Sequence, residues 1–213
     1  MPVFKLDRST TKCRLVYLAN ICENDPSSSL TVNHNQALDC GPTLDQKLTS
    51  TVVHVRFDNQ LLAFDIKKAF NNILLSENDQ NRLLFFWFKD ISKGDFSPVI
   101  YRNLRLTFGL RCSPLILMLA LFHILVIDNE NESNDLADLK KLIYQLSYMD
   151  NLAVSAETSE KLFEAYHSLK DIFDPYCFPL QQMVTNNTEL QASIDADSEE
   201  ETPETVKFLG LEW

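Results

Sequence analysis

Residues 61–75 read LLAFDIKKAFNNILL, and this stretch decides the fold. The first six residues, Leu61 to Ile66, form a near-continuous apolar run, which predicts a buried strand with a carboxylate, Asp65, close to its end. Residues 67–75 have the spacing of a helix. An acid in such a strand is costly unless it is solvated or has a positively charged partner. Asp65 is therefore the first candidate functional residue.

A second candidate, Asp150, lies in the segment Tyr148-Met149-Asp150-Asn151. Extended runs on both sides of this polar tip, from Leu139 to Ser147 and from Leu152 to Val154, predict a β-hairpin. If the hairpin neighbours the Asp65 strand, the two carboxylates can bind the same hard cations, because Mg²⁺ prefers one or two carboxylates together with phosphate oxygens and water. The alternative is that each Asp merely ends a strand.

The other segments complete the order of elements. We predict strands over 13–18, 82–88, 99–102 and 206–211, helices over 43–53 and 158–173 and from Ser113-Pro114 onward, and turns at Gly41-Pro42 and 93–95. The 82–88 strand is expected to be buried and to pair with 99–102 as a hairpin. The order of the core elements is strand, helix, long insertion, helix, hairpin, helix and strand. This order indicates an α+β fold with helices on one face of the sheet.

Charge and length limit the function classes. The 213 residues fit one domain, with or without an inserted subdomain, and carry a net charge of −11. This charge argues against strong binding of a nucleic-acid backbone, which normally requires Lys and Arg. Part of it is local, because 189–204 holds seven acids and no base, and we predict a solvated acidic loop over 189–205.

Several features point to an intracellular chain. The N-terminus has no apolar signal segment, and the longest apolar run, Pro114 to Ile127, is shorter than the ~20 residues of a membrane span, which favours a buried core helix. The five cysteines and four histidines are scattered without zinc-site spacing, so the cysteines are expected to be reduced and structural. We expect a cytoplasmic or nuclear protein that is neither secreted nor bound to a membrane.

Four segments resemble, in the same order, motifs of reverse transcriptases. They are Phe64–Phe70 (the first palm motif), Leu106–Pro114 (an aromatic-Gly-Leu segment before Ser-Pro and a helix), Tyr148–Asn151 (the Tyr-x-Asp-Asp box) and Leu209–Trp213 (the Leu-Gly-x-x-Trp primer grip). Three more are similar to Pao/BEL retrotransposons in particular: Thr11–Tyr17, Leu38–Pro42 and Asp79–Trp87. Each motif alone is weak, but the ordered set is specific and the resemblance covers most of the chain.

The resemblance implies a reverse-transcriptase-like palm, an antiparallel sheet with helices packed on one face, plus a fingers subdomain. It places the fingers at about 1–58 and 76–103 and the palm at about 59–75 and 104–213. The implied function is that of an RNA-directed DNA polymerase of a retrotransposon-derived protein, using two-metal nucleotidyl transfer. Mg²⁺ or Mn²⁺ is the implied cofactor, and an RNA or DNA template with primer and dNTP the implied partners.

The same resemblance assigns residue roles. Asp65, Asp150 and Asn151 are the implied catalytic residues, with Asp65 and Asp150 as metal ligands. The implied nucleotide-binding residues are Arg14, together with Lys12, at the triphosphate, Phe70 beneath the sugar, and Phe108 and Gly109 along the pocket. For Phe70 the alternative is core packing, and for Arg14 a surface ion pair.

The chain also departs from the family pattern. Asn151 stands where the box has its second acid, which removes a negative charge from the metal site. Residues 178–183 contain Gln181 and Gln182 where relatives carry a Lys that can protonate pyrophosphate, and the sequence stops at Trp213, before a thumb. We therefore expect weak or absent catalysis and a possible protein partner in place of the thumb. The alternatives are a non-catalytic binding or scaffold module, or an unrelated soluble α/β protein whose motifs match by chance.

Overall fold

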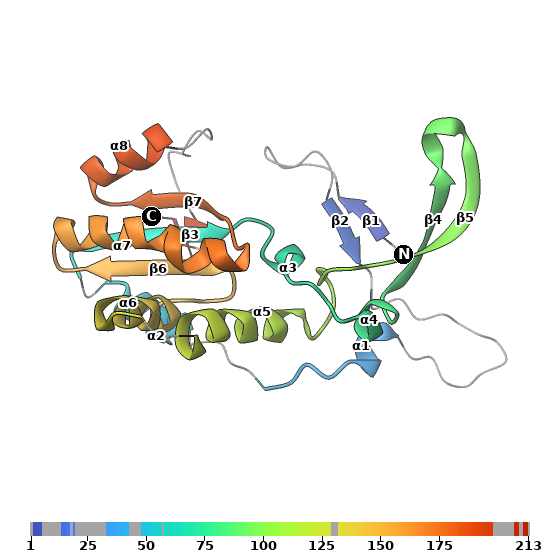
Figure 1. Cartoon of the computed structure of the whole chain (residues 1–213), viewed down its shortest axis with the longest axis horizontal. Helices are drawn as coiled ribbons and strands as arrows, with labels where there is room; N and C mark the ends of the chain where they lie inside the picture. The colour runs from blue at the N-terminus through green and yellow to red at the C-terminus, as the bar shows by residue number, and fades with distance from the viewer. Residues whose placement is uncertain are drawn as a thin grey trace. The chain divides into compact units, whose positions relative to one another are not determined.

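The structure is a computed structural model of the chain (Figure 1). It describes residues 2–5, 14–17, 19, 33–42, 48–56, 58–128, 132–197, 207–208 and 211–212, with the backbone alone for the strands before residue 18, for residue 48 and for the strands after 206. The chain forms two compact units. The first unit comprises Met1–Pro42 and Phe70–Ile116, and the second comprises Thr43–Ala69 and Leu117–Trp213.

The second unit is built on a three-stranded antiparallel sheet (Figure 1). Its central strand is β3 (Gln60–Ile66), which pairs with β6 (Asn151–Ala156) on one side and β7 (Leu180–Thr185) on the other. Leu62, Phe64 and Ile66, which alternate along β3, are each no more than 1% exposed. The buried strand predicted at 61–66 is therefore confirmed.

Helix α7 (Ser159–Phe173) covers one face of this sheet. It begins where the side chain of Thr158 accepts a hydrogen bond from the Lys161 N–H, and it packs against β3 through an edge-to-face contact of Phe64 with Phe173, whose ring centroids are 6.2 Å apart. Its buried side chains follow the helical period predicted from the sequence: Leu162, Ala165, Tyr166, Leu169, Ile172 and Phe173. A 3₁₀ turn, Asp174–Tyr176, follows.

Packing also reaches the opposite face of the sheet. Ala63 of β3 and Ala153 of β6 lie opposite each other in the strand register. They form a buried cluster with Val55 and Leu146, against which Leu142 packs. Val55 directly follows α2 (Leu48–His54), whereas Leu142 belongs to the last turn of α6 (Asn134–Gln145) and Leu146 directly follows that helix. Small residues on the strands thus let helical segments approach this face.

The hairpin predicted from Leu139 onward is wrong in its first half, because these residues belong to α6. The helix begins at Ser133, whose hydroxyl accepts a hydrogen bond from the Leu136 N–H. Leu136, Leu139, Lys140 and Ile143 are buried or half-buried and recur at the spacing of one helical face. The prediction followed the apolar content of the segment and missed this period.

Helix α5 (Ser113–Phe122) starts at the predicted Ser-Pro pair and continues into a π-helical turn, His123–Ile127. Leu117, Leu121 and Leu125 are fully buried, which confirms a core helix. Among the described residues, no helix has both the length and the apolar character needed to cross a membrane.

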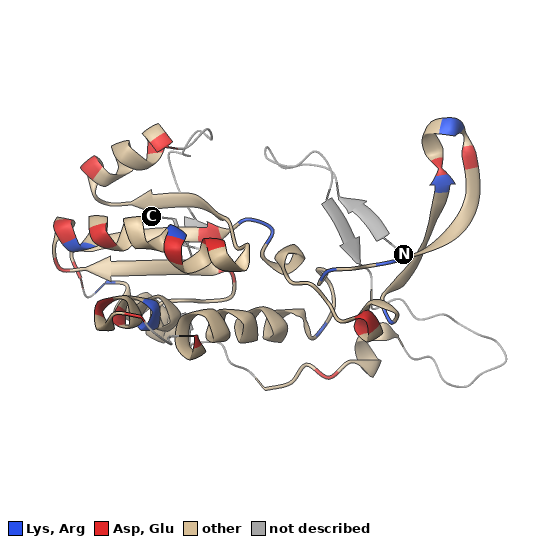
Figure 2. Ribbon diagram, viewed as in Figure 1, with Lys and Arg blue, Asp and Glu red and all other residues tan. Residues whose placement is uncertain are grey.

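The acidic loop predicted over 189–205 is wrong for its first half. Residues Thr188–Asp197 form helix α8, whose Leu190 and Ile194 are buried at helical spacing and whose acids colour its ends in Figure 2. Two buried apolar residues four positions apart are enough to anchor a short helix, and the charge count concealed them. Residues 198–205 lie outside the described part of the chain.

The closing strand predicted over 206–211 is also corrected. The chain there contains two short antiparallel strands, β8 (Lys207–Phe208) and β9 (Leu211–Glu212), with Lys207 opposite Glu212.

A buried lysine is part of the second unit. The Lys140 side chain is 2% exposed, and its Nζ donates to the Asp128 carbonyl oxygen at 2.6 Å and to Glu132 Oε1 at 2.9 Å. The hydroxyl of Tyr176 donates a short hydrogen bond to the Asp128 carboxylate, and this contact raises the pKa of Tyr176 to about 12. The network joins α6 to the segments that follow the π-helical turn and α7.

The first unit has a smaller core. Ala19, Leu83, Leu106 and Leu110 are buried together, with β1 (Pro2–Lys5) paired to β2 (Arg14–Tyr17) and with short helices α1 (His34–Ala37) and α4 (Glu77–Gln80). The strand predicted at 13–18 agrees with β2. The predicted turn at Gly41 has a φ of +64°, and an added Cβ would lie 2.2 Å from the Leu115 side chain.

The helix predicted over 67–75 is shorter than expected. Only Ala69–Asn72 form α3, because Lys68 has a left-handed φ of 55° that no α-helix continues through. Ile73 and Leu75, which follow α3, pack against the core of the first unit. For this reason the compact units divide at Ala69, whereas the fingers and palm were predicted to divide after residues 58, 75 and 103.

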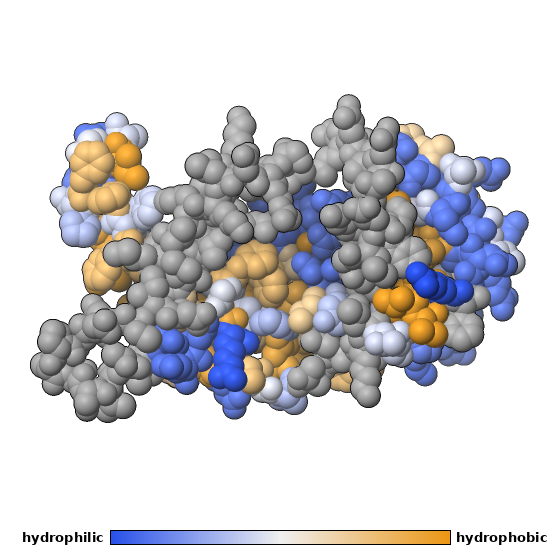
Figure 3. Space-filling model, turned by 180° about the vertical axis from the view of Figure 1, so that it is seen from behind, coloured by the Kyte–Doolittle hydropathy of each residue, from blue (hydrophilic) through white to orange (hydrophobic). Residues whose placement is uncertain are grey.

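The predicted hairpin at 82–102 is present, but its strands are not buried. Strands β4 (Leu84–Asp90) and β5 (Asp95–Arg102) are joined by a 3₁₀ turn, Ile91–Lys93, and by Gly94. One face carries large apolar side chains that are 42 to 69% exposed: Leu84, Phe86, Phe88, Phe96 and Ile100. We call these five residues the apolar band of the hairpin, and Figure 3 shows apolar surface on the hairpin. An apolar run predicts a strand but does not say whether anything covers it.

Candidate active site

Asp65 lies between two neighbouring strands at the end of β3. In the strand register it faces Asn151 of β6 on one side and Gln181 of β7 on the other. Its Oδ1 accepts a hydrogen bond from the Ile66 N–H at 2.9 Å, and its Oδ2 accepts one from Gln181 Nε2 at 2.9 Å. The sheet thus fixes both oxygens of this carboxylate.

Asp150 lies in the turn that precedes β6. The turn is closed by two hydrogen bonds, from the Tyr148 N–H to the Asn151 carbonyl at 2.9 Å and from the Asn151 N–H to the Tyr148 carbonyl at 3.1 Å. Met149 has a left-handed φ of 58°, which a tight reversal requires. The Asn151 amide lies 3.4 Å from Asp150 Oδ1. Because Asn151 is opposite Asp65, the turn brings the predicted catalytic residues together.

The surroundings of Asp65 favour its neutral form. Burial raises the pKa of the carboxyl from 3.8 to about 6, the Gln181 hydrogen bond opposes this shift, and the nearby charge of Asp150 adds to it. Two acids close enough to repel each other, with one partly desolvated, mark this strand end as a candidate functional site.

Asp65→Asn is expected to stabilise the fold at alkaline pH. Below about pH 4 the wild-type carboxyl is protonated in both folded and unfolded chains, whereas between pH 4 and 6 only the folded chain keeps its proton, so stability falls as the pH rises. After discounting for solvent, the gain from Asp65→Asn is about 1–2 kcal/mol at pH 8 and close to zero at pH 4. Urea unfolding in EDTA at pH 4 and at pH 8 measures this change in the free energy of unfolding.

The control for this prediction is Asp171→Asn on the exposed side of α7, which makes the same change in net charge. It is expected to give no such difference between the two pH values. Equal stability of wild type and Asp65→Asn at pH 8 would contradict the prediction.

The predicted nucleotide pocket has its own geometry within the first unit. The rings of Phe70 and Phe108 are in edge-to-face contact, with centroids 4.5 Å apart, and Gly109 has a φ of 97°. The Asn35 side chain holds this segment: its Nδ2 donates to the Gly109 carbonyl at 2.9 Å, and its Oδ1 accepts from the Arg111 N–H at 2.9 Å. Asn35 was not predicted, and a single Asn more than 70 positions away gives no sequence signal.

Two predicted residues are not placed. Arg14 is described by its backbone in β2 alone, and Lys12 lies outside the described residues. Phe70, Phe108 and Gly109 belong to the first compact unit, whereas Asp65, Asp150 and Asn151 belong to the second. The predicted site residues therefore form two local groups.

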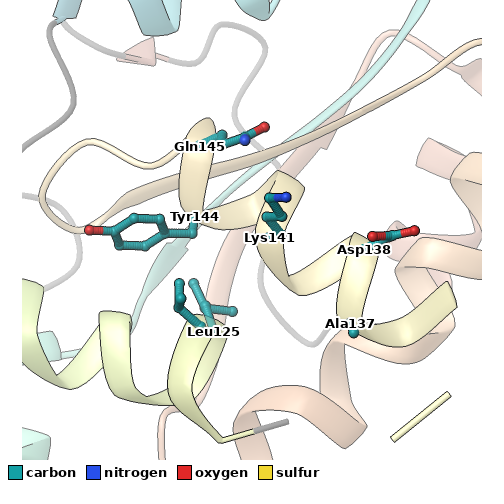
Figure 4. Close-up of a pocket in the computed structure, with 7 residues that line it drawn as sticks. Leu125, Ala137, Asp138, Lys141, Tyr144 and Gln145 are labelled. Carbon is teal, nitrogen blue, oxygen red and sulfur yellow. The ribbon is translucent and has the colours of Figure 1, made fainter. Parts of the chain in front are cut away.

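A surface pocket of about 490 Å³ lies elsewhere in the second unit, between the π-helical turn and α6 (Figure 4). Its lining combines the apolar residues Leu125, Val126 and Ala137 with polar residues that include Lys141 and Tyr144. Its lining includes none of the predicted site residues, so we assign the chemistry to the strand ends and not to this pocket.

Within the described part of the chain, no group of three or more His, Cys, Asp or Glu side chains is arranged to hold a metal ion. The donors at the strand ends are two carboxylates, Asp65 and Asp150, and the amide of Asn151. All three offer hard oxygen atoms, which suits Mg²⁺ or Mn²⁺ when substrate and water supply the other ligands.

A protein-family model described as reverse transcriptase (RNA-dependent DNA polymerase) matches residues 5–213. The chain therefore belongs to the reverse transcriptase family. This confirms the family implied by the four ordered motifs.

Solved structures agree on the fold. The structure of a foamy viral protease-reverse transcriptase dRH in complex with ds DNA aligns with 97% of this chain at a TM-score of 0.59 and 14% sequence identity. This chain spans 33% of the length of that chain. At this identity the likeness shows the fold alone, and it confirms the predicted α+β, reverse-transcriptase-like class. Among curated proteins, none has significant sequence similarity to the chain.

Proposed function

We propose that the chain is the fingers and palm part of an RNA-directed DNA polymerase from a retrotransposon-derived protein of the Pao/BEL type. Its reaction is the addition of a deoxynucleotide to a primer 3′-hydroxyl, and its substrates are dNTP and a primer paired with an RNA or DNA template. Catalysis is slow, because Asn151 replaces an acid. The observation that carries the proposal is the alignment of Asp65 with Asn151, next to Asp150, at one end of an antiparallel sheet.

The residues present fit the divalent cations of such a reaction. Asp65 and Asp150 would hold them, with Asn151 contributing an uncharged oxygen. When bound, the cations activate the 3′-hydroxyl and stabilise the leaving pyrophosphate. The sheet's own contribution is to hold the Asp65 carboxylate at the strand end, where its Oδ1 accepts a hydrogen bond from the Ile66 N–H of the same strand.

Phe70, Phe108 and Gly109 support a role in binding the nucleotide. An aromatic pair in edge-to-face contact next to a glycine with a positive φ gives an apolar surface beside a stretch of backbone without a side chain, which suits a sugar and base. Arg14, with Lys12, would bind the triphosphate. A nucleic-acid substrate is consistent with the double-stranded DNA named for the foamy viral structure.

Primer extension tests the proposal directly. Wild type is expected to extend a primer on an RNA template with Mg²⁺ or Mn²⁺ slowly but measurably, and Asp65→Asn is expected to lower the rate to background, because a neutral amide replaces one of two charged ligands. Asp171→Asn, exposed on α7, is the matched control and should retain the wild-type rate. Extension by Asp65→Asn at the wild-type rate would refute the assignment.

A non-catalytic binding or scaffold module is the second candidate. The observations in its favour are Asn151, the net charge of −11 and the acids along α6, α7 and α8 (Figure 2). It predicts no extension by any variant and no salt-sensitive affinity for primer–template. Micromolar or tighter binding that weakens steeply with salt would argue against it.

A further inference from the structure

A β-bulge selects the residue that contacts Asp65. Along β3 and β7, Leu62 pairs with Thr185 and Ala63 with Val184, but Asp65 pairs with Gln181. An unbroken register would place Gln182 there. Instead the extra residue of β7 is accommodated by a left-handed φ of 52° at Gln182. A non-glycine residue in that conformation is strained, so the contact of Gln181 with Asp65 is made at a cost.

The contact occupies the oxygen of Asp65 that is not held by its own strand. Oδ1 accepts from the Ile66 N–H, a fixed part of β3, whereas Oδ2 accepts from Gln181 Nε2, the end of a rotatable side chain. The amide presents its positive N–H end to the carboxylate. A divalent cation at Oδ2 would meet this same positive end and would compete with it for the oxygen.

We propose that Gln181 is a latch on Asp65: its amide occupies Oδ2 in the cation-free chain and must swing away before a divalent cation binds. This inference rests on the proposed function, in which Asp65 is a cation ligand. The latch separates two states of the strand end, one closed by a hydrogen bond between β3 and β7 and one open to the cation. Gln181 is thus a positioning residue that acts through Asp65.

Titration with Mn²⁺ tests the latch without any turnover. Binding to the whole chain is measured by the loss of the free-ion signal in electron paramagnetic resonance, at pH 8 and without nucleic acid. Gln181→Leu removes the amide at similar volume, so Mn²⁺ is expected to bind about tenfold more tightly than to wild type, since the competing hydrogen bond is gone. Gln145→Leu, at an exposed position of α6, makes the same change of side chain away from the bulge; it is the matched control and should bind like wild type.

Asp65→Asn, alone and combined with Gln181→Leu, separates the latch from the proposed function. If both Asp65→Asn chains lose the binding, Asp65 is a ligand, and the Gln181→Leu comparison then decides the latch. If Asp65→Asn binds Mn²⁺ as wild type does, Asp65 is not a ligand, and the proposed metal site and the latch both fail. If Asp65→Asn loses binding but Gln181→Leu binds no more tightly than wild type, the latch alone is overturned. Unfolding curves in EDTA verify that every variant is folded.

Discussion

Asn151→Asp is expected to raise the rate of primer extension about 100-fold. The change restores a negative charge next to Asp150 and opposite Asp65 in the sheet. Between unit charges 4 Å apart, an effective dielectric constant of ~20 gives roughly 4 kcal/mol, and the repulsion among three acids offsets part of it. The remaining ~3 kcal/mol corresponds to about two orders of magnitude in rate. Single-turnover extension with Mg²⁺ measures the change.

The same substitution has an opposite effect on the cation-free fold. Like charges placed directly opposite in a sheet repel, so Asn151→Asp should lower the free energy of unfolding in EDTA by about 1 kcal/mol. Mg²⁺ should then raise the melting temperature of Asn151→Asp more than that of wild type, because the added ligand binds the cation in the folded chain alone. A variant that is no faster, and that gains no extra stability from Mg²⁺, would show that residue 151 is not part of the cation site.

Lys140→Ala is expected to cost about 3 kcal/mol of folding stability. The wild-type ammonium group is 2% exposed and is satisfied by the Asp128 carbonyl and the Glu132 carboxylate. Removing it leaves both acceptors without their donor, and breaking a buried ion pair from one side costs ~3–5 kcal/mol. We expect the low end because the Glu132 side chain is 25% exposed and regains some hydration. Urea unfolding at pH 7 measures the loss.

An exposed pair on the neighbouring helix gives the control for that experiment. Lys161 Nζ and Glu157 Oε2 lie 3.4 Å apart, and the two side chains are 63% and 76% exposed. Lys161→Ala removes the same functional group but should cost no more than about 0.5 kcal/mol. If Lys140→Ala were as mild as Lys161→Ala, the buried network would have no role in stability.

The sequence predicted correctly those elements in which the spacing of the apolar residues matches the spacing of the residues that the fold buries. In the strand at Leu62–Ile66 and the helix at 159–173, the apolar residues that the pattern selects are buried or half-buried, so local spacing was sufficient. The prediction failed at α6 because a buried Lys140 interrupts its apolar face, and at α8 because acids outnumber its two buried anchors. A short stretch of sequence around Lys140 or Leu190 does not show which residues contact these side chains.

The candidate site, too, could be predicted only where a local segment of the sequence carries the signal. Motif order indicated Asp65 and Asp150, and the sheet register places Asp65 opposite Asn151, the residue that follows Asp150. Strand β7 was missed, because its residues Leu180–Thr185 are half-buried apart from the exposed Gln182 and show no clear alternation. The pairing of Gln181 with Asp65 depends on a β-bulge. The hydrogen bond from the Asn35 side chain to the Gly109 carbonyl depends on contact between segments that are distant in the sequence. Such contacts arise from tertiary structure, and spacing along the chain does not encode them.

The exposed band of the β4–β5 hairpin has a consequence for handling the chain in solution. Phe86, 69% exposed, belongs to an apolar surface that water wets poorly. At low ionic strength the net charge of −11 keeps molecules apart. Added salt screens that repulsion within about 10 Å at 0.1 M but leaves apolar attraction intact. The colloidal stability of the chain is therefore greatest in dilute buffers of low ionic strength, and concentrated saline solutions drive its molecules together.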